Sequence, residues 1–326
     1  MTVNNKHSWL ASAPSNIALI KYMGKLNHEK NFPTNSSLSY TLNHLTSHVK
    51  LESNTKNHDI WLPFENQKSI LSDKAQNRFI QHLIRLKQYF NYEGFFIIRS
   101  DNNFPGNCGI ASSASSFAAL TQCAVKALSE LTQQSLPDIN IIAQWSREGS
   151  GSSCRSFFSP WCLWSEDKIM PLALPYESLI HQVIIVSHDK KAVSSSEAHK
   201  QVTQSPLFTG RAERAENRLS ALIEALKNQS WPDIYELCWT EFWDMHALFE
   251  TSNPAFGYLT HDTLNVIQSI RKHWEKVGDG PIVTIDAGPN VHLLYRPEQL
   301  DLSNQIKLQF KNNYAILSSM ENNNAK

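Results

Sequence analysis

Apolar and polar positions along the chain form two kinds of pattern: short apolar or alternating runs, and longer runs with apolar residues at helical spacing. The first pattern is typical of β-strands and the second of amphipathic helices. The first predicted strand is an apolar segment that begins at residues 18–20 and stops at 24–25. Further strands are predicted at 36–42, 46–51, 60–62, 95–98, 161–164, 183–186, 282–285, 291–295 and 314–317. Helices are predicted at about 74–90, from 112 onward, 138–148, 210–227, 233–250 and 261–274, with a last helix before residue 314.

The stretch from residue 100 to 120 joins a strand, a loop and a helix. Pro105, Gly106 and Gly109 break the loop, and serines open the helix at Ser112. First-turn N–H groups lack intrahelical partners and the helix dipole favours negative charge there, so such a start can bind phosphate. An ordinary capped helix explains the stretch as well. It matches neither the Walker pattern nor Gly-x-Gly-x-x-Gly.

The bulk composition limits the classes of protein. A length of 326 residues is enough for about two domains, and we place their boundary near residue 187, giving 1–187 and 188–326. The hydrophobic content of 41% is that of a globular protein, and a formal charge of zero indicates no nucleic-acid or membrane partner. No run approaches the roughly 18 apolar residues of a membrane span. Any anion site must therefore be local.

Cysteine and histidine spacing points away from a metalloprotein. The five cysteines are scattered without a Cys-x-x-Cys pair, which fits reduced thiols in a cytoplasmic protein better than a disulfide framework or a zinc site. The thirteen histidines contain no His-Glu-x-x-His or other tight ligand spacing. We therefore predict that no metal is bound by protein ligands alone.

Four short polar segments lie where no core pattern explains them. Tyr22 and Lys25 end an apolar strand, and residues 150–155 gather serines and glycines around Arg155. The third segment is 190–196 and the fourth contains Asp286, which follows a strand and precedes Gly-Pro-Asn. Each has an ordinary structural explanation as a solvated turn, a helix stop or a loop. Together they supply the cations, hydroxyls and carboxylate that phosphoryl transfer to an anionic substrate requires.

These segments also carry a family resemblance. Residues 13–25 read Ala-Pro-Ser-Asn-Ile-Ala-Leu-Ile-Lys-Tyr-Met-Gly-Lys, which resembles the N-terminal signature of the diphosphomevalonate decarboxylases, with Met23 where the family usually has Trp. The blocks at 33–39, 102–114, 149–155, 193–196 and 286–290 match the family in order, with Ser153 in place of Ala. The match is collinear from about residue 11 to 295, and the 102–114 block resembles the ATP loop of the GHMP kinase superfamily.

The resemblance implies a fold and a reaction. The fold is an α+β, two-domain GHMP kinase fold, with an N-terminal part like ribosomal protein S5 domain 2, a left-handed βαβ crossover and an α/β-sandwich C-terminal part. The implied protein is a cytoplasmic homodimer. It uses ATP and Mg²⁺ to decarboxylate (R)-5-diphosphomevalonate to isopentenyl diphosphate, with ADP, phosphate and CO2 as the other products, in the mevalonate pathway of isoprenoid biosynthesis.

The resemblance also assigns roles. Asp286 acts on the 3-hydroxyl and stabilises the cationic carbon, Lys25 neutralises the phosphate being transferred, and Arg155 binds the substrate carboxylate. The implied substrate-binding residues are Tyr22, Met23, Gly24, Lys25, Ser150, Gly151, Ser152, Ser153, Cys154, Arg155, Ser195 and Ser196. The implied ATP-phosphate residues are Gly109, Ile110, Ala111, Ser112 and Ser113, with Mg²⁺ bound mainly through the phosphates.

Two departures from the family bear on the substrate. Ala198-His199 replaces a Gly-Met pair, and Asp59 stands where many relatives have an arginine that contacts the substrate's phosphates. A carboxylate there would repel an anion. A basic group elsewhere, such as Lys190, Lys191 or His199, could replace the arginine, or the substrate could carry one phosphate rather than two.

Three alternative activities remain at this point. A phosphomevalonate decarboxylase and a mevalonate 3-kinase share the fold, and Asp59 keeps the first of these open. The presence of Asp286, Lys25 and Arg155 together argues against a pure kinase. A non-catalytic nucleotide-binding regulator would keep the ATP loop but should have lost part of that set.

Overall fold

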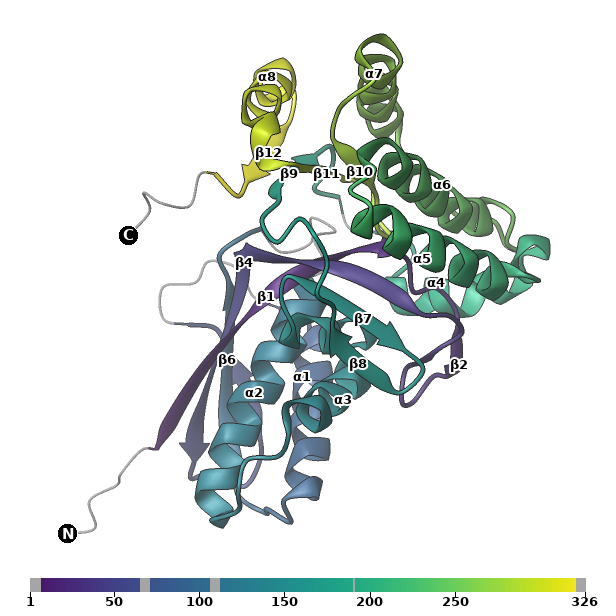
Figure 1. Cartoon of the computed structure of the whole chain (residues 1–326). Coiled ribbons are helices and arrows are strands. Elements are labelled where there is room, and N and C mark those ends of the chain that lie inside the picture. The colour runs from purple at the N-terminus through teal and green to yellow at the C-terminus, as the bar shows by residue number, and fades with distance from the viewer. Residues whose placement is uncertain (1–6, 65–70, 106–111, 190, 321–326) are drawn as a thin grey trace.

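The computed structural model describes residues 7–64, 71–105, 112–189 and 191–320. Two sheets with their helices form its body (Figure 1). The first sheet contains β1 (Ser8–Ile20), β4 (Ser37–Asn54), β5 (Ile60–Leu62), β6 (Phe95–Asn102), β7 (Trp161–Ser165) and β8 (Lys168–Pro171). The second contains β9 (Ile180–Ile185), β10 (Ile282–Thr284), β11 (Val291–Tyr295) and β12 (Ala315–Ser318). A small hairpin joins β2 (Lys25–Asn27) to β3 (Phe32–Pro33).

The long strand β4 organises the first sheet. One edge pairs antiparallel with β1 from Ser8↔Glu52 to Ile20↔Leu38, and the other edge pairs with β6 and then β7. Along 45–51 every second residue is buried, as expected for a strand with one face on a core. The predicted strands 36–42 and 46–51 are therefore one strand. Because β1 follows β4 throughout, the end of β1 at Ile20 is fixed by a long ladder.

Three helices, α1 (Asp73–Tyr89), α2 (Ser112–Thr132) and α3 (Ile139–Gly149), lie below the first sheet (Figure 1). Ala114, Ala118, Ala119 and Ala124 of α2 are fully buried, and small side chains let this helix approach the strands closely. The 3₁₀ helix η1 (Gly151–Phe157) follows α3 at once, with Ser150 between the two. The loop segment 150–155 is therefore a tight turn buried behind α2 and α3.

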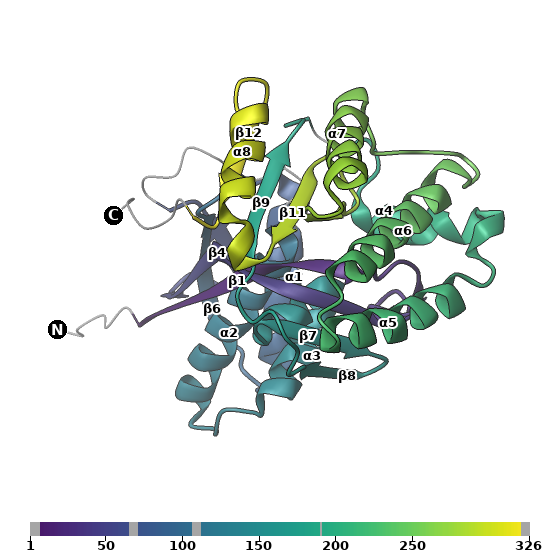
Figure 2. The same ribbon diagram turned by 45° about the horizontal axis from the view of Figure 1, so that its top comes forward.

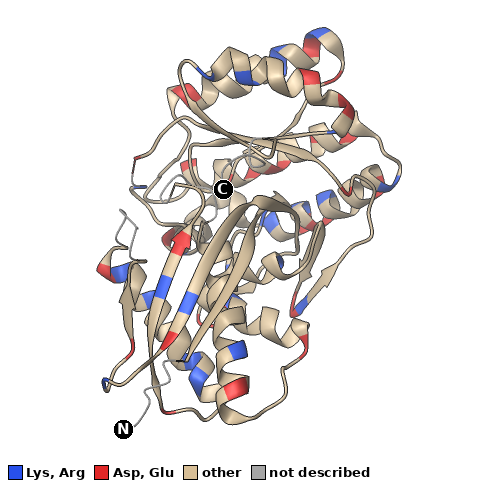
Figure 3. Cartoon of the chain, turned by 90° about the vertical axis from the view of Figure 1, so that its left-hand side faces the viewer, with Lys and Arg blue, Asp and Glu red and all other residues tan. Residues whose placement is uncertain are grey.

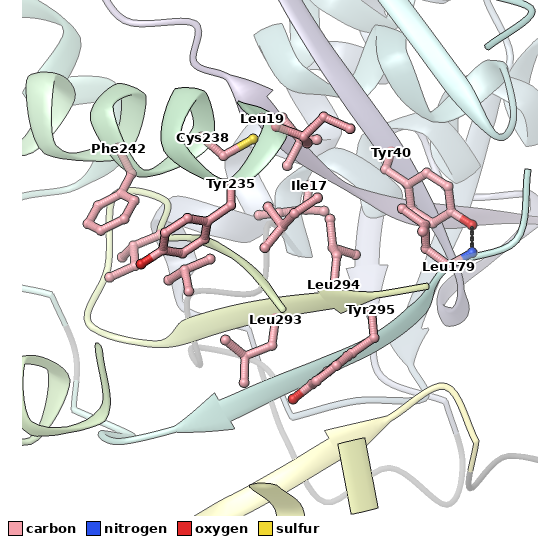
Figure 4. Packing of buried hydrophobic residues seen from close by; sticks show 14 of the residues in the cluster. Ile17, Leu19, Tyr40, Leu179, Tyr235, Cys238, Phe242, Leu293, Leu294 and Tyr295 are labelled. Atoms are coloured by element: carbon pink, nitrogen blue, oxygen red, sulfur yellow. Dashed lines mark hydrogen bonds between the residues drawn. The ribbon is translucent and has the colours of Figure 1, made fainter. Parts of the chain in front are cut away.

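The remaining helices lie above the second sheet or to one side of it, in the second half of the chain (Figures 1 and 2). They are α4 (Ser195–Gln201), η2 (Val202–Gln204), η3 (Pro206–Phe208), α5 (Arg211–Lys227), α6 (Trp231–Glu250), α7 (His261–Val277), η4 (Pro297–Gln299) and α8 (Leu300–Phe310). Along β11, Leu294 points toward Ile17 of β1 while Leu293 points to the opposite face (Figure 4). Residues of α6 such as Phe242 close the side of this core. One hydrophobic cluster thus joins both sheets.

Most of the predicted elements are confirmed, with ends shifted by a few residues. The first strand is the exception, because β1 begins at Ser8 rather than at residue 18 and ends at Ile20 rather than at 24–25. Apolar periodicity did not reveal β2, β3, β8 or α4, which are short and polar or lie at turns. The strand β9 pairs with β11 and β12, so the second sheet begins at Ile180. A division at residue 187 remains a proposal. In the part of the chain that the structure describes, no helix has both the length and the apolar content to cross a bilayer.

Positions of Lys and Arg are interspersed with positions of Asp and Glu along the helices (Figure 3), in keeping with the formal charge of zero. One acidic residue of interest is buried instead. Asp59, just before β5, accepts hydrogen bonds from Lys87 Nζ and from the backbone N–H of Phe96, both at 2.8 Å. The Asp59 side chain is only 3% exposed. Asp59 is thus half of an internal ion pair that joins β5, α1 and β6.

The Asp59–Lys87 pair yields a stability prediction. Lys87→Met leaves the Asp59 carboxylate buried without its cation, which should lower the free energy of unfolding by about 3–5 kcal/mol. Adding Asp59→Asn should restore much of this loss. Urea unfolding measures both, with the exposed Lys126→Met as the matched control, expected within about 0.5 kcal/mol of the wild type. Equal stability of Lys87→Met and Lys126→Met would contradict the buried-pair interpretation.

Candidate active site

A buried ion pair joins the two sheets at the centre of the site. Lys21 follows the last residue of β1, and Asp286 lies in the turn between β10 and β11. Lys21 Nζ is 2.6 Å from Asp286 Oδ1, although the two residues are 265 positions apart. The Lys21 side chain is 2% exposed and that of Asp286 25%, so the carboxylate keeps an open side. This open side is where a ligand can meet the pair.

The backbone of Lys21 is held by side chains from α5 and α6. Its N–H donates to Glu241 Oε1 at 2.9 Å, and its carbonyl accepts from Asn35 Nδ2 at 2.9 Å and Arg211 Nη2 at 3.3 Å. Arg211 and Glu241 are themselves an ion pair at 2.5 Å, and both are almost fully buried. Arg218 and Asp244 extend the network. The direction in which Lys21 leaves β1 is therefore fixed from the second half of the chain.

Opposing effects act on the Asp286 carboxyl. Burial would raise its pKa, but the positive charge and hydrogen bond of Lys21, with His292 and Arg155 nearby, hold the pKa below its ordinary value. Lys191 Nζ donates to the carbonyl of Ala287, the next residue. His246 of α6 lies close by, and burial lowers its pKa to about 3, so that its ring is neutral near pH 7. Asp286 is thus an ionised carboxylate with cations around it.

Arg155 is positioned by the buried η1 turn. Its Nε donates to Asn16 Oδ1 at 3.2 Å and its Nη1 to Ser37 Oγ at 3.0 Å. Asn16 in turn donates to Ser156 Oγ at 2.8 Å, so β1 and η1 are tied together. The guanidinium lies 5.9 Å from the ring centre of Trp164. These contacts fix the guanidinium within electrostatic range of Asp286, a suitable arrangement for binding a carboxylate beside it.

Tyr22 forms a wall between the β1 end and α4. Its ring lies 4.3 Å from that of His199 and 4.7 Å from that of Trp164. A Cβ at Gly151 would lie 2.7 Å from the Tyr22 ring, so the close approach requires glycine there. The N–H of Gly24 donates to His199 Nδ1 at 3.0 Å. His199 is therefore bound within this wall, and the Ala198-His199 departure fills space against Tyr22.

Lys25 lies in a separate cationic region. Its Nζ donates to Asn31 Oδ1 at 2.6 Å. Burial, followed by the charges of Arg78 and Lys200, lowers the pKa of Lys25 to about 8. Arg78 itself donates to the Gly149 carbonyl at 3.1 Å. Lys25 and Arg78 both bond neutral oxygens, so an anionic ligand would relieve their mutual repulsion.

The predicted ATP loop is described in part. Gly109, Ile110 and Ala111 lie outside the described residues, whereas Ser112 and Ser113 open α2. Ser150 Oγ donates to Ser113 Oγ at 3.4 Å, so the helix start adjoins the turn that carries Arg155. The first turn of α2 holds no acidic residue. These features suit a phosphate at the helix start.

Some predicted ligand-binding side chains are engaged in the fold. Ser153 Oγ bonds Ser146 and the Ser150 carbonyl, and Cys154 is fully buried with burial raising the pKa of its thiol to about 12. Met23 packs in a hydrophobic cluster. Ser195 and Ser196 are exposed in the first turn of α4. Among the predicted residues, the contacts above place Asp286 near Arg155, Tyr22 against Gly151, and Ser150 at the start of α2, whereas Lys25 lies in its own cationic region.

Three residues of the site were not predicted from the sequence. Lys21 lies inside the first matched block, but it was treated as part of the apolar strand and not as a candidate site residue. The lysine that pairs with Asp286 is Lys21 rather than Lys25. Asn16 lies in the same block and positions Arg155. His246 carries no local signal, because α6 is apolar around it. The apolar run at the end of β1 was the one usable clue, since a lysine directly after a buried strand must find a partner.

The donors present suit a metal bound through a nucleotide. Among the described residues, no three His, Cys, Asp or Glu side chains are grouped so that they could hold a metal ion. Magnesium usually keeps several waters and binds through one or two carboxylates plus substrate phosphates. The residues near α2 therefore fit Mg²⁺ only as a companion of bound phosphates, with Ser112 and Ser113 as the nearest hydroxyls.

Comparison with known proteins covers nearly the whole chain. Residues 13–170 match the model of the diphosphomevalonate decarboxylase-like N-terminal domain, and residues 181–325 match that of the mevalonate 5-diphosphate decarboxylase C-terminal domain. The chain is 32% identical to a diphosphomevalonate decarboxylase of Candida albicans over 93% of this chain and 86% of the relative.

Solved structures agree with this similarity. A mevalonate diphosphate decarboxylase from Legionella pneumophila is 55% identical, with a TM-score of 0.91 over 95% of this chain and 100% of the other. A complex of MDDEF with MVAPP, AMPPCP and magnesium is 27% identical, with a TM-score of 0.84 over 96% and 97% of the two chains. The similarity therefore extends over both sheets and their helices.

The lowered pKa of Lys25 predicts a pH dependence. An anion bound at Lys25 needs its charged form, so kcat/KM for a phosphorylated ligand should be high below pH 8 and fall as the pH rises through about 8. Lys25→Arg should move this fall to higher pH, because a guanidinium keeps its charge, and Lys25→Met should lower kcat/KM throughout. An alkaline limb that Lys25→Arg leaves in place would show that another group causes it.

Proposed function

The chain belongs to the diphosphomevalonate decarboxylase family, and we infer from this that it catalyses the ATP-dependent decarboxylation of mevalonate diphosphate. The products are isopentenyl diphosphate, ADP, phosphate and CO2, a step of isoprenoid biosynthesis by the mevalonate pathway. Its fold is accordingly the α+β GHMP kinase fold. The observation that carries the inference is the Lys21–Asp286 pair beside Arg155, because this chemistry needs a carboxylate, a cation and a carboxylate-binding group together.

In the proposed first step, the 3-hydroxyl oxygen attacks the γ-phosphorus of ATP, the bond to the β-phosphate oxygen breaks and ADP leaves. Asp286 orients the hydroxyl and accepts its proton as the new P–O bond forms. Lys21 keeps Asp286 ionised beforehand and supplies positive charge next to the oxygen being phosphorylated. Lys21 is better placed for this than Lys25, which bonds Asn31.

In the proposed second step, the C3–O bond breaks and phosphate departs with its electron pair. Positive charge develops at C3, and the ionised Asp286 stabilises it. The bond from C2 to the carboxyl carbon then breaks, CO2 leaves and its electrons form the double bond. Arg155 holds the carboxylate until this point through its fixed guanidinium. The phosphate takes up the proton that the hydroxyl lost, so the reaction is balanced in protons.

The nucleotide is proposed to bind at the start of α2, with Ser112, Ser113 and the preceding loop around its phosphates. The MDDEF complex with AMPPCP and magnesium supports ATP and Mg²⁺ as the pair used by relatives. Mg²⁺ neutralises phosphate charge when bound. The contact of Ser113 with Ser150 would place the γ-phosphate next to the turn that carries Arg155.

The distal phosphates of the substrate are assigned to the region around Lys25. Arg78 and Lys200 act on Lys25 through their charges, and so gather positive charge on that side of Tyr22. Asp59 is neutralised by Lys87 inside the first domain and gives no reason to prefer the monophosphate. We therefore assign the diphosphate as substrate, as in the MVAPP complex of the relative. Ser195 and Ser196 are proposed to contact it from α4.

The family resemblance also suggests a cytoplasmic homodimer. Four cysteines are described, and all four are buried free thiols, which suits a reducing compartment. Both assignments, cytoplasm and dimer, are part of the proposal.

The substrate assignment predicts the products of three assays. With ATP and Mg²⁺, carboxyl-labelled mevalonate 5-diphosphate should release labelled CO2 and ADP in equal amounts, while mevalonate and its 5-phosphate should release far less. CO2 mainly from the 5-phosphate would identify a phosphomevalonate decarboxylase instead. ADP without CO2 would identify a 3-kinase.

The role of Asp286 predicts a split between binding and turnover. Asp286→Asn keeps the size of the side chain but cannot take a proton, so kcat should fall by about 10²-fold or more. The Kd for an ATP analogue should change little, because the nucleotide binds at α2. The exposed Asp189→Asn is the matched control and should keep full activity. Near-wild-type kcat in Asp286→Asn would refute the assignment.

A further inference from the structure

Three histidines from three different strands form a line between the two sheets. His181 Nδ1 lies 3.1 Å from His44 Nε2, and His181 Nε2 lies 3.0 Å from His292 Nδ1. The ring centres are 5.0 and 5.2 Å apart. His44 is on β4, His181 on β9 and His292 on β11, so the line crosses from the first sheet to the second. We call these residues the histidine line.

The inner end of the line is directed toward Asp286. His292 is the cross-strand partner of Thr284, so the two side chains share a face of the second sheet. Thr284 bonds the Ala18 carbonyl of β1, which shows that this face looks toward β1. Asp286 is two residues beyond Thr284 and turns the same way to reach Lys21. Burial lowers the pKa of His292, and the charge of Asp286 acts in the opposite direction, as expected for a carboxylate on this side of the sheet.

The outer end of the line is nearer to solvent. His181 and His292 are 1% and 2% exposed, whereas His44 is only partly buried. The line therefore leads from the carboxylate at the site to the edge of the molecule, through the interface between the sheets. Apolar residues such as Val183 and Leu294 flank it on β9 and β11. Apolar side chains could fill that space without burying six ring nitrogens, so packing alone does not account for the line.

The line has the form of a proton path rather than a metal site. The two contacts use different nitrogens of His181, so the rings follow one another instead of surrounding a point. Among the residues described, no three-ligand cluster of His, Cys, Asp or Glu is present. A neutral imidazole has one donor and one acceptor nitrogen, so three in series can all point the same way. Such a series can pass a proton by shifting each N–H in turn.

We propose that the histidine line takes the proton that Asp286 receives from the 3-hydroxyl and returns it when phosphate leaves. This inference rests on the proposed function. In the outward direction, the Asp286 O–H bond breaks and a proton joins His292 Nε2. The His292 Nδ1 proton passes to His181 Nε2, and the His181 Nδ1 proton passes to His44 Nε2. The return reverses these transfers and restores the original tautomers.

Proton balance explains why a returning path is useful. Phosphorylation of the hydroxyl releases one proton, and the departing phosphate later takes one up. Between these events Asp286 must be ionised to stabilise the charge at C3, so the proton cannot stay on it. The path removes the proton from Asp286 for that interval and supplies it afterwards.

The charges around the line suit transient protonation. Burial, opposed by the charge of Asp286 and aided by those of Lys21 and His44, lowers the pKa of His292 to about 4. The pKa of Asp286 is held below its ordinary value by Lys21, so neither group keeps a proton firmly near pH 7. Burial also lowers the pKa of His44 to about 4 and that of His181 well below its usual range, where His44 and His292 contribute. The line therefore rests neutral and returns a proton readily.

The test replaces the middle ring. His181→Gln keeps a donor and an acceptor for both neighbours but cannot pass a proton on, and His181→Phe removes both hydrogen bonds. His48→Gln, also on β4 and bonded to Ser12 at 2.6 Å, is the matched control outside the line. Rapid-quench single turnovers with mevalonate 5-diphosphate, ATP and Mg²⁺ measure ADP and CO2 formation, repeated in H2O–D2O mixtures.

The expected result distinguishes a role of the histidine line in proton transfer from a purely structural role. Both His181 variants should lose about tenfold or more in the single-turnover rate, within the range that positioned proton transfer contributes, with KM nearly unchanged. The wild-type rate should depend on the deuterium fraction along a curve, because several protons move, and this curvature should vanish in His181→Gln. His48→Gln should match the wild type in every respect.

Two outcomes would overturn the proposal in distinguishable ways. If His181→Gln keeps the wild-type rate and isotope dependence, the line is only structural, and the proposed function stands. If the wild type releases no CO2 from the diphosphate, the proposed function fails and the relay fails with it. Should His181→Phe not fold, His181→Gln alone decides.

Discussion

The Lys21–Asp286 ion pair constrains the arrangement of the whole molecule. Two charges buried at 2.6 Å recover their desolvation cost only when the geometry is good and further hydrogen bonds satisfy the remaining atoms. Lys21 comes from the end of β1 in the first sheet, and Asp286 from the turn after β10 in the second. The two sheets must therefore meet at one relative position. The buried Arg211–Glu241 pair, which binds the backbone of Lys21, helps to fix that position.

The hydrophobic core between the sheets also fixes their relative position. Ile17 and Leu19 of β1 pack with Leu294 of β11 and Phe242 of α6 in one cluster. Because protein interiors are close-packed, this contact resists sliding of one sheet over the other. Through the same interface runs the histidine line, the main polar feature of an otherwise apolar region. The contact between the sheets that positions the carboxylate thus also contains the three histidines.

The sequence predicts the individual helices and strands better than it predicts which distant residues come into contact. Helical periodicity located α1, α5 and α7 to within a few residues, and the matched blocks predicted Arg155, Tyr22 and Asp286 as site residues. Contacts between residues far apart in the chain leave no pattern in the local sequence. Lys21 and Asp286 are separated by 265 residues, and the histidines by 137 and 111. For the same reason Asp59 looked like an unfavourable charge, because its partner Lys87 is not implied by any spacing.

Lys21 and Lys25 are four positions apart, and their different surroundings give them different electrostatic properties. Lys21 is buried against a carboxylate, so its charge is balanced before any ligand binds. Lys25 bonds a neutral amide oxygen, and the charges of Arg78 and Lys200 act on it, so that its pKa falls to about 8. The first arrangement favours the ionised form of Asp286. In the second, like charges disfavour one another, so an anion bound there would relieve the repulsion, and in our proposal the phosphates of the substrate do so. Both lysines lie in one matched block of the sequence, but only the positions of their partners in the fold show that their environments differ.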